Sequence, residues 1–203
     1  MKRSDVMACF VRHRKEEIAI CGVGRTHSEL FHAEHRDTNL YSIQLGYPLP
    51  LGLGLALALP KERVVVLEGD GSILADLGIL ATIANLNVSN LTSIIFDNES
   101  YEGGGTHASA TAGKSRLVEI AKGAGIANAT EVRNLADFEK AVSAALQSTE
   151  YHFIVAKVEL DQKSYAPLPF DKTENAILFQ RALANKGLTA GYKTAIARHY
   201  ELP

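Results

Sequence analysis

Two short clusters of polar side chains, at residues 68–72 and 97–101 of this 203-residue chain, each follow an apolar run. The runs, at residues 64–67 and 91–96, are typical of short buried strands. Parallel strands end at one edge of an open α/β sheet, and ligands bind at that edge. If the two runs are neighbouring parallel strands, both polar clusters meet there.

The residue types in these clusters suit a magnesium–diphosphate ligand. Asp70 offers a carboxylate oxygen and Asn98 an amide oxygen, and Mg²⁺ takes few protein oxygens while keeping water and substrate phosphates as its other ligands. Gly69 and Gly71 let the backbone approach a ligand closely. Ser72 would open a helix, whose free N–H groups favour a phosphate. The alternative is that Gly-Asp-Gly is only a turn and Asn98 only a loop residue.

The elements that position these residues alternate along the chain as strand and then helix. This alternation predicts an α/β fold: a doubly wound, mostly parallel sheet with helices on both faces. We expect residues 1–160 to form this domain and residues 161–203 to form a C-terminal arm with short helices. Strands are expected at 18–21, 64–67, 91–96, near 126 and at 153–158, and helices at 1–15, 28–35, 49–59, 72–86, 117–124, 135–146, 176–184 and 190–199.

Composition argues against several classes of partner. The net charge is −2 with no basic stripe, so no nucleic-acid partner is expected. No apolar run approaches the roughly 20 residues that a membrane span needs. The N-terminus lacks the apolar core of a signal peptide. Cys9 and Cys21 do not make a disulfide framework, so we expect a cytoplasmic protein.

Three weaker patterns carry less weight. The Gly-x-Gly turn at residues 22–24 lacks the third glycine of the dinucleotide fingerprint. Residues 108–115 satisfy a relaxed P-loop pattern, but no buried strand directly precedes them, so we expect a loop there and no ATP site. Three glycines at residues 103–105 predict a mobile loop. The nearby histidines, His27, His32, His35 and His107, are expected at the surface.

The motif at residues 69–71, followed after twenty-six residues by Asn98, resembles the signature of thiamine diphosphate-dependent enzymes. The resemblance is to their diphosphate-binding, C-terminal domain. It implies that Asp70 and Asn98 bind Mg²⁺ through their side chains and that Ser100 binds it through its backbone carbonyl. One position departs from the family: the residue before Asn98 is usually Asn, and here it is Asp97.

The same resemblance implies further contacts with thiamine diphosphate. Leu45 would be the bulky residue that wedges the cofactor into its bent shape, with ordinary core packing as the alternative. The backbone carbonyl of Ile43 would accept a hydrogen bond from the exocyclic amine of the aminopyrimidine ring. At the first strand–helix junction, Gly24 and Arg25 would face the diphosphate. The other cofactor-binding residues expected are Gly69, Gly71, Ser72 and Tyr101.

Residues 18–159 are similar to the β subunit of sulfopyruvate decarboxylase and to the matching half of phosphonopyruvate decarboxylase. The similarity implies a decarboxylase subunit for a short 2-oxo acid, with no catalytic residue assigned to this chain. The activating glutamate would come from a pyrimidine-binding α subunit, in a dimer or hetero-oligomer. The alternatives are a carboligase resembling acetolactate synthase, an oxidoreductase half of the same superfamily, or a non-catalytic cofactor-binding module.

Overall fold

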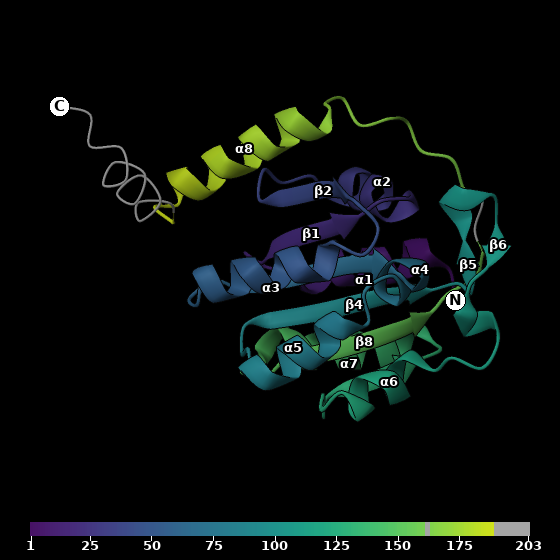
Figure 1. Cartoon of the computed structure of the whole chain (residues 1–203). Helices are drawn as coiled ribbons and strands as arrows, with labels where there is room; N and C mark the ends of the chain where they lie inside the picture. The colour runs from purple at the N-terminus through teal and green to yellow at the C-terminus, as the bar shows by residue number, and fades with distance from the viewer. Residues whose placement is uncertain (161–162, 189–203) are drawn as a thin grey trace.

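The computed structural model describes residues 1–160 and 163–188, and its centre is a six-stranded sheet of order β2-β1-β3-β4-β8-β7. All neighbouring strands in this sheet run parallel (Figure 1). The α/β, doubly wound fold class is therefore confirmed. The strands are β1 (Ile18–Gly22), β2 (Asn39–Ile43), β3 (Val64–Gly69), β4 (Leu91–Asp97), β7 (Ala129–Val132) and β8 (His152–Lys157).

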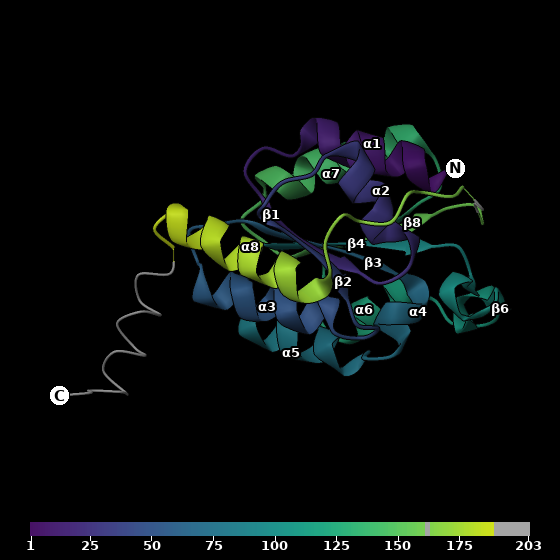
Figure 2. The ribbon, with the colours of Figure 1, turned by 90° about the horizontal axis from the view of Figure 1, so that it is seen from above.

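Helices cover both faces of the sheet (Figure 2). Side chains alternate across β3, so Val65 and Leu67 join one apolar core while Val64 and Val66 join the other. The helices α1 (Arg3–His13), α2 (Arg25–Ala33) and α7 (Leu135–Gln147) lie on one face, and α3 (Pro48–Ala58), α5 (Gly78–Leu86) and α6 (Leu117–Gly123) on the other.

The carboxyl ends of the two central strands carry the polar clusters. Strand β3 passes directly into the short helix α4 (Asp70–Leu74), and Gly69 is in register with Phe96 of β4. Asp70 and Asn98 therefore leave neighbouring strands at the same edge. Beyond β4 the chain forms a small antiparallel pair and two 3-10 turns: β5 (Ser100–Tyr101), η1 (Glu102–Gly104), β6 (His107–Ala108) and η2 (Ala110–Ala112).

Several expected elements differ from those observed. The continuous helix expected at residues 72–86 is wrong: α4 and α5 are separate, with a turn at residues 75–77. Ile126 is buried in the loop before β7 and is not in a strand. Strand β2 was not among the expected strands. Within α3, Gly52 packs on the sheet, whereas Gly54 is exposed.

Helix α8 (Lys172–Asn185) covers the edge strand β2. The buried side chain of Asn175 accepts a hydrogen bond from Tyr41 N (2.8 Å) and donates one to the carbonyl of Asn39 (3.2 Å). The expected helix at residues 176–184 is thus longer than expected, and the one at 190–199 lies outside the described residues. Within the described ranges, no helix is long and apolar enough to cross a bilayer.

Candidate functional site

A cavity of about 600 Å³ opens at the carboxyl edge of the sheet. Its volume lies within the range of small-molecule binding sites. Ile43 is not among the described residues that line it, and the Ile43 carbonyl accepts a hydrogen bond from Val23 N at 2.9 Å. The other ten residues expected from the sequence all line the cavity: Gly24, Arg25, Leu45, Gly69, Asp70, Gly71, Ser72, Asn98, Ser100 and Tyr101.

Asp70 is a buried carboxylate held by two hydroxyl groups. Its Oδ2 atom accepts hydrogen bonds from Ser109 Oγ and from Thr111 Oγ1, the latter at 3.0 Å. Burial raises the pKa of Asp70, the Ser109 hydrogen bond opposes that shift, and the charge of Asp97 adds to it. Both hydroxyls contact Oδ2, which fixes the orientation of the carboxylate, and the backbone N–H of Gly71 also stabilises its charged form.

Asn98 and Ser100 are fixed by the turn that follows β4. The Asn98 Oδ1 atom accepts a hydrogen bond from Ser100 N at 3.0 Å, and Ser100 Oγ donates to the His107 carbonyl at 3.2 Å. Carboxylate, amide and backbone carbonyl oxygens are hard ligands of the kind that Mg²⁺ prefers. The donor set of Asp70, Asn98 and Ser100 therefore fits a magnesium ion.

Close backbone contacts shape the floor of the cavity. A Cβ atom at Gly71 would stand 2.4 Å from Cε1 of Tyr101, so only glycine fits against that ring. Gly46, which has φ +83°, donates its N–H to Ser72 Oγ at 3.1 Å. The side chain of Leu45 is 39% exposed, which excludes the alternative that it is an ordinary core residue.

The glycine-rich loop expected to be mobile is tied to the body of the protein by Glu102. Arg3 donates to Glu102 Oε2 at 2.8 Å, and Arg25 Nε lies 3.5 Å from the same oxygen. Arg3 also forms a buried ion pair with Glu29 at 2.9 Å. His107 is exposed, as expected, and lines the cavity. The predicted cofactor contact Arg25 therefore already has a carboxylate partner.

Sequence reasoning missed Ser109 and Thr111, which lie in the segment that resembles a P-loop. That segment is a 3-10 turn and a loop, with α6 beginning at Leu117, so the expectation of a loop is confirmed. Its two hydroxyls turn toward Asp70. A Ser-x-Thr pattern is too common to have identified them, and their partner lies about forty residues earlier in the sequence.

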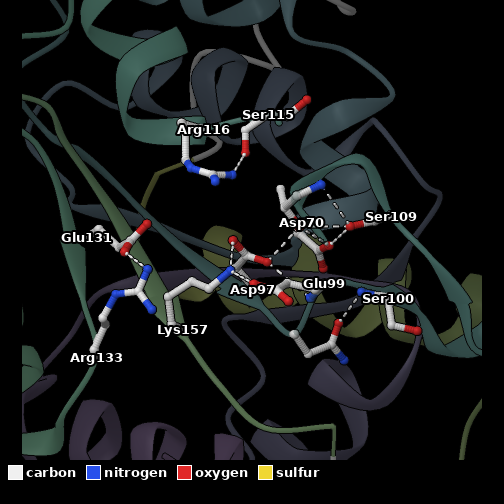
Figure 3. Close-up of polar contacts among 12 residues, drawn as sticks. Asp70, Asp97, Glu99, Ser100, Ser109, Ser115, Arg116, Glu131, Arg133 and Lys157 are labelled. Carbon is white, nitrogen blue, oxygen red and sulfur yellow. Dashed lines mark hydrogen bonds and ion pairs between the residues drawn. The ribbon is translucent and has the colours of Figure 1, made fainter. Parts of the chain in front are cut away.

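Lys157, at the end of β8, was also missed. Its Nζ atom lies 2.9 Å from Asp97 Oδ2 and 2.5 Å from Glu99 Oε1 (Figure 3). Burial opposes the charged ammonium, but the hydrogen bonds that Lys157 donates to Glu99 and Asp97 outweigh it and raise the pKa of Lys157. Asp97, the residue at which the sequence departs from the family pattern, therefore forms an ion pair with Lys157.

Comparison with known proteins agrees with this geometry. Residues 23–156 match the family described as thiamine pyrophosphate enzyme, C-terminal TPP binding domain. The chain is 37% identical over 166 residues to the sulfopyruvate decarboxylase subunit beta of Methanocaldococcus jannaschii, covering 77% of this chain and 83% of that one. The same-named subunit of Methanococcus maripaludis is 29% identical, covering 90% of this chain and 98% of that one.

A solved structure shares the fold. The thiamine diphosphate-dependent 4-hydroxybenzoylformate decarboxylase of Rhodococcus jostii RHA1 superposes with a TM-score of 0.67 at 19% identity. The match covers 80% of this chain and 33% of that chain, so the present chain spans about a third of the solved protein.

Proposed function

This chain belongs to the thiamine pyrophosphate enzymes, in the family of their C-terminal TPP-binding domain, and from that premise we propose that it is the thiamine diphosphate- and Mg²⁺-binding subunit of a non-oxidative 2-oxo acid decarboxylase. The observation that carries the proposal is the meeting of Asp70 and Asn98, from neighbouring strands, in one cavity with Gly24 and Leu45.

Each residue has a role that its chemistry supports. Asp70, Asn98 and the Ser100 carbonyl would hold Mg²⁺, and Leu45 would set the conformation of the cofactor. Bound thiamine diphosphate supplies a carbon nucleophile and accepts the electron pair that decarboxylation releases. The chain itself would bind and orient the cofactor and shield it from water.

We propose that a pyrimidine-binding partner chain completes the site and supplies the activating glutamate. The relatives that support this are named as beta subunits. Two apolar side chains near the cavity also lack full cover, since Leu45 is 39% and Tyr47 63% exposed. Leu45 lines the cavity itself, so its exposure supports a site that another chain covers.

The proposed substrate is a short 2-oxo acid of the sulfopyruvate or phosphonopyruvate type. Both relatives are named as subunits of sulfopyruvate decarboxylase, which supports a substrate that carries a sulfonate group. The guanidinium groups of Arg3 and Arg25 line the cavity, and arginine suits the recognition of acidic oxygens. Both guanidinium groups contact Glu102, so the carboxylate already present would compete with the acidic group of the substrate.

Calorimetric titration of thiamine diphosphate into the purified chain tests the proposal. Binding is expected with Mg²⁺, and it should disappear with EDTA or in Asp70→Ala. The control Asp37→Ala changes an exposed aspartate that pairs with His35, and it should bind like the wild type. Adding a candidate partner chain and sulfopyruvate should then release carbon dioxide.

The outcomes separate the alternatives. A product with a new carbon–carbon bond would identify a carboligase instead. Binding without turnover in any combination would indicate a non-catalytic module. The absence of binding both alone and with partner chains would overturn the proposal.

A further inference from the structure

A continuous chain of contacts connects Lys157 to Asp70. Lys157 and Asp97 are cross-strand neighbours in the register of β8 and β4, and their ion pair is 2.9 Å long. Asp97 Oδ1 lies 2.8 Å from Thr111 Oγ1, and that hydroxyl lies 3.0 Å from Asp70 Oδ2. Figure 3 shows the lysine reaching across the strand ends toward both Asp97 and Glu99.

Hydrogen-bond counting explains what the lysine does in this chain. Thr111 has one hydroxyl proton, yet the carboxylates of Asp97 and Asp70 both lie within reach of it. Asp97 has two other donors, Lys157 Nζ at 2.9 Å and Glu99 N at 3.1 Å. With those donors in place, Asp97 does not need the Thr111 proton, which can be donated to Asp70.

The charges lead to the same conclusion. The side chains of Asp97 and Lys157 are only 4% and 15% exposed, so solvent screens this pair weakly. Without Lys157, the buried carboxylate of Asp97 would have no cationic partner, and Thr111 would connect it to Asp70. The motif that the sequence resembles has a neutral Asn at this position, and here Lys157 neutralises Asp97.

We propose that Lys157 is a positioning residue of the metal site, acting through Asp97 and Thr111 to hold the carboxylate of Asp70. The inference rests on the proposed function. In this proposal Lys157 compensates for the negative charge of Asp97. Thr111 connects Asp97 to Asp70.

The variant Lys157→Met tests the proposal by titration of thiamine diphosphate at saturating Mg²⁺. Affinity should fall about tenfold, as expected when a charge-assisted hydrogen bond is lost. Adding Asp97→Asn should restore affinity to within about threefold, because the amide carries no charge to neutralise. Lys157→Arg should bind nearly as the wild type does.

Glu99 provides the matched control, since its carboxylate contacts the same ammonium at 2.5 Å but, among the described residues, has no hydrogen bond to the Thr111 hydroxyl. The variant Lys157→Met/Glu99→Gln should therefore stay as weak as Lys157→Met alone. Equal rescue by Asp97→Asn and Glu99→Gln would overturn the proposal, because it would indicate only a charge at the strand ends.

A measurement without cofactor keeps this test separate from that of the proposed function. Among the described residues, side-chain hydrogen bonds lead from Lys157 through Asp97 to Thr111, and from Thr111 to Asp70 either directly or by way of Ser109 Oγ. In the apo protein, the thermal midpoints of Lys157→Met, Asp70→Asn and the double variant should be non-additive by about 3 °C. Additive midpoints would overturn the proposal even if the wild type binds thiamine diphosphate.

Discussion

Gly52 of α3 lies against Val66 of β3 so closely that a Cβ atom at position 52 would stand 2.2 Å from Val66 Cγ2. Gly54, in the same helix, has open space around the same position. We expect Gly52→Ala to lower the free energy of unfolding by about 1–3 kcal/mol, the usual cost of overpacking. Gly54→Ala should raise it by up to about 1 kcal/mol through helix propensity. Urea unfolding of both variants measures this, and equal effects would contradict the packing shown.

Removing the hydroxyl of Ser109 should lower the free energy of unfolding, because that hydroxyl donates a hydrogen bond to Asp70. Ser109→Ala deprives a buried carboxylate of a hydrogen bond, which costs about 2 kcal/mol at neutral pH. Because the Ser109 bond lowers the pKa of Asp70, the loss should shrink at acidic pH, where Asp70 is protonated in both proteins. Ser115→Ala, in the same loop, is the control and should be near neutral. A pH-independent loss in Ser109→Ala would contradict this account.

Glu68 should make the stability of the protein depend on pH. Its side chain is 1% exposed, and burial raises its pKa from 4.5 to about 7. A carboxyl group whose pKa is raised by folding stabilises the protein below the unfolded pKa and loses that contribution as pH rises through the folded value. Stability should therefore fall by roughly 3 kcal/mol between about pH 4.5 and 7, at about 1.4 kcal/mol per unit.

The variant Glu68→Gln isolates this effect. Its free energy of unfolding should not fall as the pH rises from 4.5 to 7, and above pH 7 it should be more stable than the wild type. Urea unfolding across the pH range measures this. Glu119→Gln, on the exposed side of α6, serves as the control and should follow the wild-type curve. Parallel curves for Glu68→Gln and the wild type would show that Glu68 does not control the dependence.

Asn175 should contribute to stability through the edge strand β2. Asn175→Ala leaves Tyr41 N and the Asn39 carbonyl without their partner from α8, at a cost of about 1–3 kcal/mol. The control Gln180→Ala changes an exposed residue of the same helix. Amide exchange at Tyr41 should quicken in Asn175→Ala and not in Gln180→Ala. Unchanged exchange in both variants would contradict the role of Asn175.

The sequence predicted those parts of the fold where local pattern and burial agree. Strands β3 and β4 were found because their apolar runs are buried throughout, and the polar residues after them marked the sheet edge. The break between α4 and α5 was missed because apolar residues continue at helical spacing across residues 75–77. Strand β2 was missed because the polar residues Asn39 and Ser42 interrupt its apolar pattern and its edge is completed by Asn175, far along the chain.

The candidate site also contains some residues that a local sequence pattern marks and others that only distant contacts place. The glycines, Asp70 and Asn98 were identified because motif spacing carries them, and the structure brings them to one cavity. Ser109, Thr111 and Lys157 could not be found this way. Their partners lie 39, 41 and 58–60 residues away, and nothing local in the sequence marks those contacts.

The separation between Asp70 and its hydroxyl donors has a consequence for folding. Asp70 is placed locally by the β3–α4 junction, but Ser109 and Thr111 arrive only after β4 and the segment beyond it have formed. Contacts of such long range close late, because loop-closure entropy must be overcome first. The carboxylate geometry is therefore a property of the whole cooperative unit, so binding of a divalent ion at Asp70 would report on global folding of the chain and not on the local motif.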